Sequence, residues 1–131
     1  MAYSIHKAKN AQEIKEREYG IADQMIKFTK FTSCLGIVAI NNEGKLIGIH
    51  LSVVDENGDA FSPTVVPLVT SLVRSDPRKV VFVGHNYLWE ENLPVAYNEL
   101  KNALQPSDTT DGEDGTYQAV IENGEIIVNR I

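Results

Sequence analysis

Residues 34–51, CLGIVAINNEGKLIGIHL, consist of two apolar segments joined by a polar turn. Residues 34–40 are almost continuously apolar, which is typical of a buried strand, and residues 45–51 form the second segment. The three residues 41–43 suit a type I turn, and Gly44 can adopt the left-handed conformation of a G1 bulge. The sequence therefore predicts a β-hairpin at its centre.

The segments after this hairpin predict two helices and three more strands. Residues 63–74 repeat apolar side chains at i, i+3, i+4 and i+7, as an amphipathic helix does. A buried strand follows at residues 79–84, and a second amphipathic helix follows at residues 93–104. A terminal strand pair at residues 116–121 and 125–131 is joined by Asn123-Gly124, a type I′ turn signal. We therefore expect an α+β fold, with a mixed sheet built from two hairpins and two amphipathic helices packed on it.

The remaining segments are more polar. Asn10 can cap a short charged helix and Glu13 can complete a capping box, so residues 10–20 predict a helical appendage to the core. Residues 24–32 mix β-branched and aromatic residues with lysines, which indicates a half-exposed strand. Residues 105–115 are polar and acidic, and we expect a mobile loop there.

Length and composition limit the classes of protein to which the chain can belong. The 131 residues are 43% hydrophobic and 23% charged, which fits one globular domain spanning residues 1–131. No apolar run approaches the roughly 20 residues of a transmembrane helix, so membrane insertion is not expected. The N-terminus lacks the apolar block of a secretory signal, so we expect a cytoplasmic protein or an effector exported without such a signal.

The formal net charge of −6 argues against a nucleic-acid partner, because no basic patch accompanies it. The excess acidity comes from a stretch without Lys or Arg that contains Asp108, Asp111, Glu113, Asp114, Glu122 and Glu125. The single cysteine, Cys34, permits neither an intrachain disulfide nor a cysteine-based zinc site, and we expect no metal and no cofactor.

The hairpin register decides whether Cys34 can meet a histidine. A three-residue loop ending at Gly44 gives pairs whose numbers sum to 86, which places Cys34 opposite Ser52 and makes His50 its diagonal neighbour on the same face. A two-residue loop gives a sum of 85 and sends Cys34 and His50 to opposite faces. Gly44 favours the first register.

A thiol beside an imidazole is a candidate nucleophile and base. Proton transfer to His50 would give a thiolate at Cys34, whose attack on a carbonyl yields an acyl-thioester that water releases. Backbone N–H groups around Ser33 and Cys34 are candidates to stabilise the oxyanion, because a chain that turns into a strand presents unpaired donors.

The Thr32-Ser33-Cys34 entry to the strand, the Asn-Asn-Glu-Gly turn and the Gly48-x-His50 arm resemble the bacterial chemotaxis receptor glutamine deamidase family, CheD. The cytotoxic necrotizing factor toxins share this Cys/His plan. The order of helices and strands over residues 24–131 also follows the family. The resemblance implies an α/β/β sandwich and a papain-like thiol deamidase that acts on a glutamine side chain of another protein.

Within this resemblance, Cys34 is the nucleophile and His50 the base. The family's third catalytic residue, a threonine six positions before the cysteine, falls on Phe28, and the adjacent Thr29 is our candidate for it. We expect Ser33, Thr32 and Ser52 to serve the oxyanion or the substrate. The alternatives are a non-catalytic protein-binding domain on the same fold and another thiol hydrolase, such as a peptidase; oligomeric state and substrate identity are not encoded in these patterns.

Overall fold

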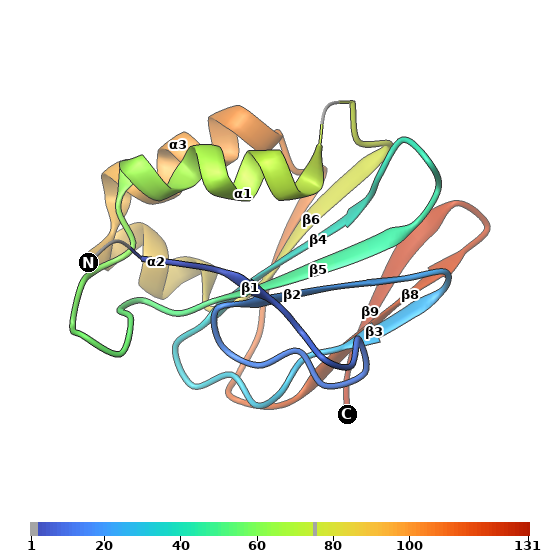
Figure 1. Cartoon of the computed structure of the whole chain (residues 1–131), viewed down its shortest axis with the longest axis horizontal. Helices are drawn as coiled ribbons and strands as arrows, with labels where there is room; N and C mark the ends of the chain where they lie inside the picture. The colour runs from blue at the N-terminus through green and yellow to red at the C-terminus, as the bar shows by residue number, and fades with distance from the viewer. Residues whose placement is uncertain (1–2, 75) are drawn as a thin grey trace.

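The computed structural model describes residues 3–74 and 76–131, and over these residues it contains nine strands and three α-helices arranged in three layers (Figure 1). The strands are β1 (His6–Lys7), β2 (Glu18–Ala22), β3 (Met25–Lys27), β4 (Leu35–Ile40), β5 (Leu46–Leu51), β6 (Lys79–Gly84), β7 (Asp108–Asp111), β8 (Tyr117–Glu122) and β9 (Glu125–Arg130). The helices are α1 (Val66–Val73), which a 3₁₀ turn at Pro63–Val65 precedes, α2 (Asn86–Asn92) and α3 (Pro94–Leu104).

The middle layer is a six-stranded mixed sheet with the order β1-β2-β5-β4-β6-β7. Its four inner strands pair antiparallel, and the two edge strands β1 and β7 pair parallel to their neighbours. Helices α1 and α3 cover one face, and the antiparallel sheet β3-β8-β9 covers the other face (Figure 1). The chain is therefore an α+β sandwich, as the sequence predicts.

The register of the central hairpin is the predicted one. Gly36 pairs with His50 and Ile40 pairs with Leu46, so paired numbers sum to 86. Gly44 has φ = +82°, the left-handed conformation expected where a G1 bulge closes the loop. The second hairpin is also confirmed, because Asn123 and Gly124 both have positive φ and Glu122 pairs with Glu125.

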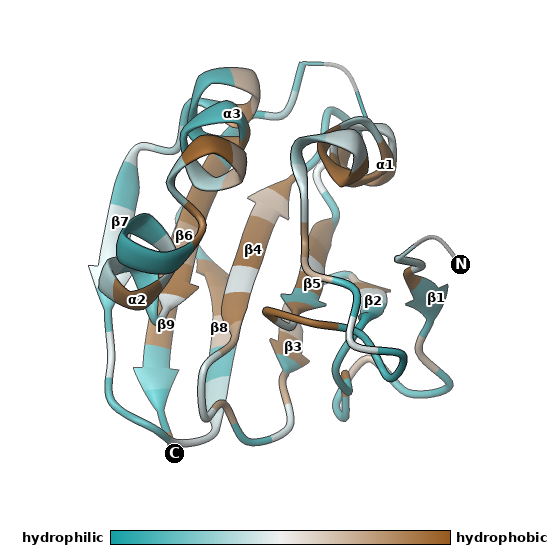
Figure 2. Cartoon of the chain, turned by 90° about the vertical axis from the view of Figure 1, so that its left-hand side faces the viewer, coloured by the Kyte–Doolittle hydropathy of each residue, from teal (hydrophilic) through white to brown (hydrophobic). Residues whose placement is uncertain are grey.

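Side-chain alternation along β4, β5 and β6 divides the interior into two apolar cores. One set packs against the helices and includes Leu35, Ile37, Ile49 and Phe82. The opposite set lies between the two sheets, where the absence of a side chain at Gly48 makes room for Ile26 and Phe28. Apolar colour marks β4 and β6 in Figure 2, whereas β1 and β7 at the edges are hydrophilic.

The helix predicted over residues 10–20 is wrong. The Asn10 side chain accepts a hydrogen bond from the backbone of Gln12 at 2.9 Å, which closes a turn and not a helix. Ile14 is fully buried in a β-bridge to Phe28, and the chain then enters β2. Tertiary burial of one isoleucine in a charged segment has overridden the local helix signal.

Three further predictions need correction. The strand predicted over residues 24–32 is regular only over Met25–Lys27, and the chain then bends so that Phe28 and Phe31 enter the same core. The acidic segment 105–115 contains edge strand β7, and a helix that was not predicted, α2, precedes α3. The two hairpins do not build one sheet: the first lies in the six-stranded sheet and the second in the three-stranded sheet.

Candidate functional site

The structure brings Cys34 and His50 to the same face of the six-stranded sheet. Cys34 lies two residues before Gly36, which pairs with His50, and it belongs to the core between the two sheets. The His50 ring packs on that side too, with its centroid 4.5 Å from that of Phe31. Residues in this diagonal relationship have Cβ atoms within roughly 7–8 Å.

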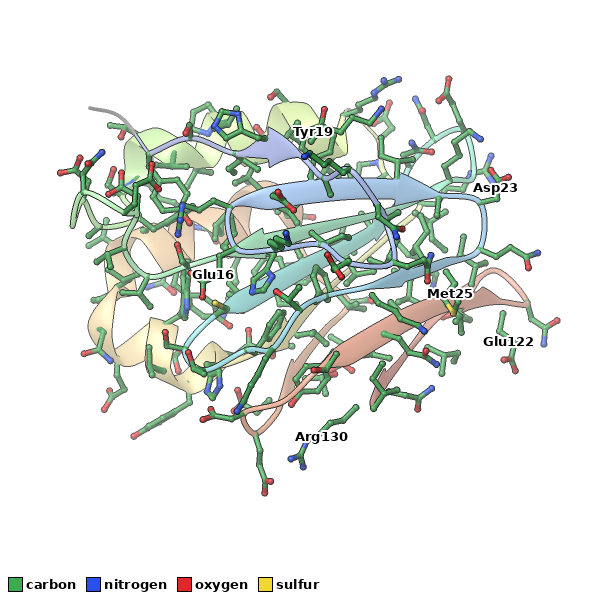
Figure 3. The ribbon with its side chains drawn as sticks, turned by 60° about the horizontal axis from the view of Figure 1, so that its bottom comes forward. Glu16, Tyr19, Asp23, Met25, Glu122 and Arg130 are labelled. Carbon is green, nitrogen blue, oxygen red and sulfur yellow. The ribbon has the colours of Figure 1, made fainter. Side chains whose placement is uncertain are left out.

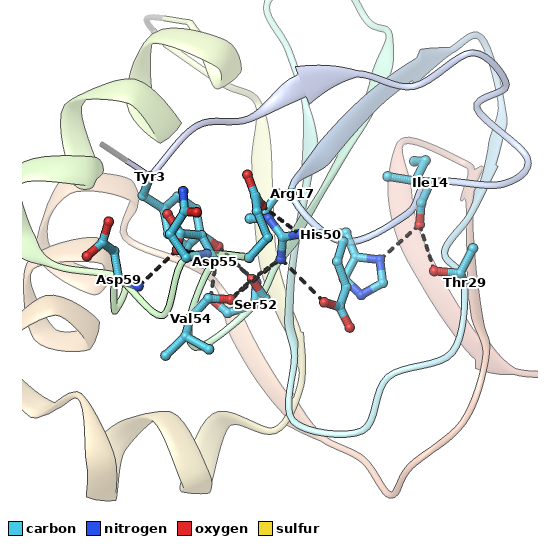
Figure 4. Close-up of polar contacts among 12 residues, drawn as sticks. Tyr3, Ile14, Arg17, Thr29, His50, Ser52, Val54, Asp55 and Asp59 are labelled. Atoms are coloured by element: carbon cyan, nitrogen blue, oxygen red, sulfur yellow. Dashed lines mark hydrogen bonds and ion pairs between the residues drawn. The ribbon is translucent and has the colours of Figure 1, made fainter. Parts of the chain in front are cut away.

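A backbone carbonyl orients the imidazole. Nδ1 of His50 lies 2.9 Å from the carbonyl oxygen of Ile14 (Figure 4), and because a carbonyl only accepts, the contact requires a proton on Nδ1. The lone pair of the neutral ring is then on Nε2. Ile14 belongs to the N-terminal segment, so this partner comes from outside the hairpin.

The Nε2 atom of His50 is buried and has no hydrogen-bond partner among the described residues. The side chain is 0% exposed, and this burial lowers the pKa of His50 below its ordinary value. The ring is therefore neutral near pH 7. An unpartnered buried acceptor on the face that holds the thiol is the arrangement a general base requires.

The thiol of Cys34 is 1% exposed, and burial is the main cause that raises its pKa to about 12. The negative charge of Glu16 raises the pKa further, whereas the backbone amides of Ser33 and Thr32 lower it. The resting pair is thus a neutral thiol and a neutral imidazole, not the thiolate–imidazolium pair expected from sequence.

Thr29 lies beside the site without bonding the imidazole. Its backbone N–H and its Oγ1 donate to the Ile14 carbonyl, at 2.9 Å and 3.4 Å, so among the described contacts it shares the acceptor used by His50. Figure 4 shows Thr29 and His50 on two sides of this carbonyl. Thr29 therefore helps to fix the group that orients the ring.

The other predicted site residues flank Cys34 in sequence or lie opposite it in the hairpin register. The carbonyl of Ser33 accepts a hydrogen bond from the Trp89 indole at 2.9 Å, and Thr32 is exposed. Ser52 follows β5 opposite Cys34, and its Oγ lies 2.8 Å from Nη1 of Arg17. The buried hydroxyl of Tyr3 also binds Ser52, donating to its carbonyl at 2.8 Å.

Sequence reasoning missed the N-terminal contribution to the site, because residues 3–17 carry no motif and predict only an appendage. Glu16 lies on the loop beside the strand ends, as Figure 3 shows. Arg17 contacts Glu16, Ser52 and Glu56 through its guanidinium group. The signal that was available is the pair of opposite charges at 16 and 17 next to the buried Ile14.

His85 lies on the other side of Cys34, because its backbone N–H donates to the Cys34 carbonyl at 3.0 Å. Its Nε2 is 2.9 Å from Oδ1 of Asp114, although the pair lacks hydrogen-bond geometry. Over residues 3–74 and 76–131, no group of three or more His, Cys, Asp or Glu side chains is arranged to hold a metal ion. Within the same residues, no helix is long and apolar enough to cross a bilayer.

Comparison with known proteins adds no family to this geometry. No protein-family model matches the chain, and no curated protein matches its sequence.

Proposed function

We propose that the chain is a thiol-dependent protein glutamine deamidase that uses Cys34 and His50. The observation that carries the proposal is the orientation of His50, whose Nδ1 is held by Ile14 while Nε2 is buried without a partner among the described residues, on the face of Cys34. The resemblance of residues 32–51 to the CheD family supports glutamine as the substrate group.

The reaction begins with a neutral pair. Nε2 of His50 accepts the thiol proton as Sγ of Cys34 attacks the carboxamide carbon, which forms the C–S bond. The tetrahedral intermediate collapses when the imidazolium returns the proton to the departing nitrogen, and ammonia leaves. Water, deprotonated by His50, then attacks the thioester carbonyl, which releases a glutamate side chain and the thiol.

The amides near Cys34 suit stabilisation of the developing charge. The backbone N–H groups of Ser33 and Thr32 already favour negative charge at the sulfur, as their effect on the thiol pKa indicates. An oxyanion that forms beside this sulfur would meet the same donors. Trp89 supports the turn by its bond to the Ser33 carbonyl.

The test uses synthetic glutamine peptides and a casein substrate, with matched asparagine peptides as the control. Deamidation releases ammonia and adds about one dalton per glutamine without cleaving the chain, since only the side-chain amide is replaced by an acid. We expect this product with the unaltered chain and none with Cys34→Ser or His50→Ala. Cleavage of the peptide backbone would identify a peptidase instead.

The burial of the thiol favours a second candidate, a non-catalytic protein-binding domain. Cys34 is 1% exposed and its raised pKa keeps it protonated, as in a structural cysteine. Iodoacetamide separates the two candidates. A nucleophile activated by His50 becomes markedly slower to alkylate in His50→Ala, whereas a structural thiol reacts at the same slow rate in both proteins.

A further inference from the structure

The turn of residues 15–18 is fixed to His50 of the candidate site from both of its sides. Before the turn, the Ile14 carbonyl contacts Nδ1 of His50, and within it the backbone N–H of Arg17 donates to the His50 carbonyl at 2.6 Å. The Glu18 N–H closes the turn on the Lys15 carbonyl at 3.0 Å. Glu16 therefore stands between two residues that are both fixed to His50.

Arg17 ties the Glu16 side chain to the strand that carries the base. Its Nη1 lies 3.4 Å from Oε1 of Glu16 and 2.8 Å from Oγ of Ser52. Its Nη2 lies 3.1 Å from a carboxylate oxygen of Glu56, which follows β5. Ser52 is opposite Cys34 in the hairpin register, so this network holds the Glu16 carboxylate at the Cys34 end of the sheet.

The exposed fractions of the Glu16, Cys34 and His50 side chains identify Glu16 as a cover over the other two. The Glu16 side chain is 46% exposed, whereas Cys34 and His50 are almost completely buried. Figure 3 shows Glu16 on the loop at this end of the sheet, and its negative charge is among the causes that raise the pKa of Cys34. A side chain half in solvent and held by one arginine can swing away without unfolding the core, since surface ion pairs contribute little free energy.

We propose that Glu16 covers the Cys34–His50 site and marks the place where a substrate glutamine side chain binds. This inference rests on the proposed deamidase function. Glutamate is the product of glutamine deamidation and has the same length and branching as the substrate side chain. The resting chain is thus closed by a product-like group of its own, and a partner's glutamine must displace it.

The substitution Glu16→Gln turns this cover into a substrate. Sγ of Cys34 then attacks Cδ of the new carboxamide, His50 passes the thiol proton to the leaving nitrogen, and ammonia departs. Water hydrolyses the thioester between Cys34 and Cδ, which restores the thiol and leaves glutamate at position 16. No other reactant is required.

The first experiment measures the rate at which iodoacetamide alkylates Cys34. We expect Glu16→Ala to react about tenfold faster than the unaltered chain, because the thiol becomes accessible and loses a neighbouring negative charge. Glu13→Ala is the matched control, since Glu13 is an exposed glutamate of the same segment. Glu16→Gln must stay as slow as the unaltered chain, because the carboxamide still covers the thiol.

These rates decide whether the side chain of residue 16 covers the thiol, without reference to activity. Equal rates for Glu16→Ala and Glu13→Ala would overturn the proposal. Fast alkylation of Glu16→Gln would overturn it as well, because that result would indicate general loosening of the segment. Thermal melting of each variant checks that the fold is intact.

The second experiment follows Glu16→Gln by peptide mapping in a mass spectrometer. We expect residue 16 of this variant to gain about one dalton with time, while the native Gln12 does not, and we expect no gain in the Glu16→Gln, Cys34→Ser double variant. Peptide mapping keeps the Asn123-Gly124 turn in a separate fragment. If the thiol of Glu16→Gln stays protected but residue 16 gains no mass, Glu16 remains the cover of the site. That result would reject both glutamine as the substrate group and the deamidase activity.

Discussion

Nδ1 of His50 and the carbonyl oxygen of Ile14 lie 2.9 Å apart and join two segments that are 36 positions apart in the chain. This contact selects the Nδ1–H tautomer, because the carbonyl has no proton to offer. We expect long-range proton–nitrogen NMR correlations near pH 7.5 to show a protonated Nδ1 and an unprotonated Nε2 in His50. A protonated Nε2 would contradict the assignment of this atom as the base.

The same spectra, recorded over a range of pH, give the protonation state of the His50 ring. Burial lowers the pKa of His50 in the folded protein, so the unfolded chain takes up its proton first as the pH falls. The contribution of His50 to stability is therefore complete above its unfolded pKa, about 6.5, and is lost below it. The exposed His6 provides a solvent-accessible ring in the same sample.

Alkaline stability gives a second prediction. Burial raises the pKa of Cys34 to about 12 in the folded protein, above an unfolded value of about 8.5. The unfolded chain therefore loses the thiol proton first, so stability is complete below about pH 8.5 and falls as the pH rises toward 12. We expect the free energy of unfolding, measured in guanidinium chloride with a reductant, to fall between pH 8 and pH 10.

Cys34→Ser separates the thiol from other groups that titrate in this range. Burial also raises the pKa of Tyr3 to about 12, and Tyr3 remains in the variant. We expect the decline of unfolding free energy to be shallower in Cys34→Ser than in the unaltered chain. Parallel declines would mean that the thiol is solvated, and would remove the main argument for a sealed site.

The central hairpin was predictable because its information is local. The position of Gly44 fixes the register, and a slip of one residue would send His50 to the helical face. The second hairpin was predictable for the same reason, since Asn123-Gly124 selects its turn. The confirmed helix at Pro94–Leu104 follows from a clear apolar period.

The N-terminal segment was not predictable, because its conformation depends on contacts distant in sequence. Asn10 closes a turn with the same side-chain chemistry that would cap a helix, so the local pattern fits both structures. The orienting group of His50 is a backbone carbonyl, which carries no residue signature. Glu16 shows its relationship to Cys34 only when the segment is folded over the hairpin.

Gly84 provides a third prediction beside the site. Its φ is +108°, and a Cβ at this position would lie 2.7 Å from the Cys34 carbonyl oxygen and 2.7 Å from the Phe31 ring. We expect Gly84→Ala to lower the free energy of unfolding by more than the ~1–2 kcal/mol of a left-handed backbone alone. Guanidinium unfolding monitored by Trp89 fluorescence measures the loss.

Gly58→Ala is the matched control for this substitution. Gly58 also has a positive φ, +86°, but nothing lies within 4 Å of an added Cβ. The loss of unfolding free energy in Gly58→Ala therefore reports the backbone cost, and the difference between the two variants reports the overlap at Cys34 and Phe31. Equal losses of unfolding free energy would show that the chain around Cys34 shifts easily to accommodate the added Cβ.

Trp89 provides the last prediction, since its fully buried indole donates from Nε1 to the Ser33 carbonyl at 2.9 Å. Trp89→Phe keeps most of the apolar volume but leaves this carbonyl without its donor, which costs about 1–3 kcal/mol. Because Ser33 precedes Cys34, we also expect faster alkylation of the thiol. Tyr97→Phe is the control, because it removes a buried donor to Asn86 that lies outside the Cys34 turn. It should lower the free energy of unfolding without changing the alkylation rate, and a similar rate increase in both variants would contradict a specific role of Trp89 at the site.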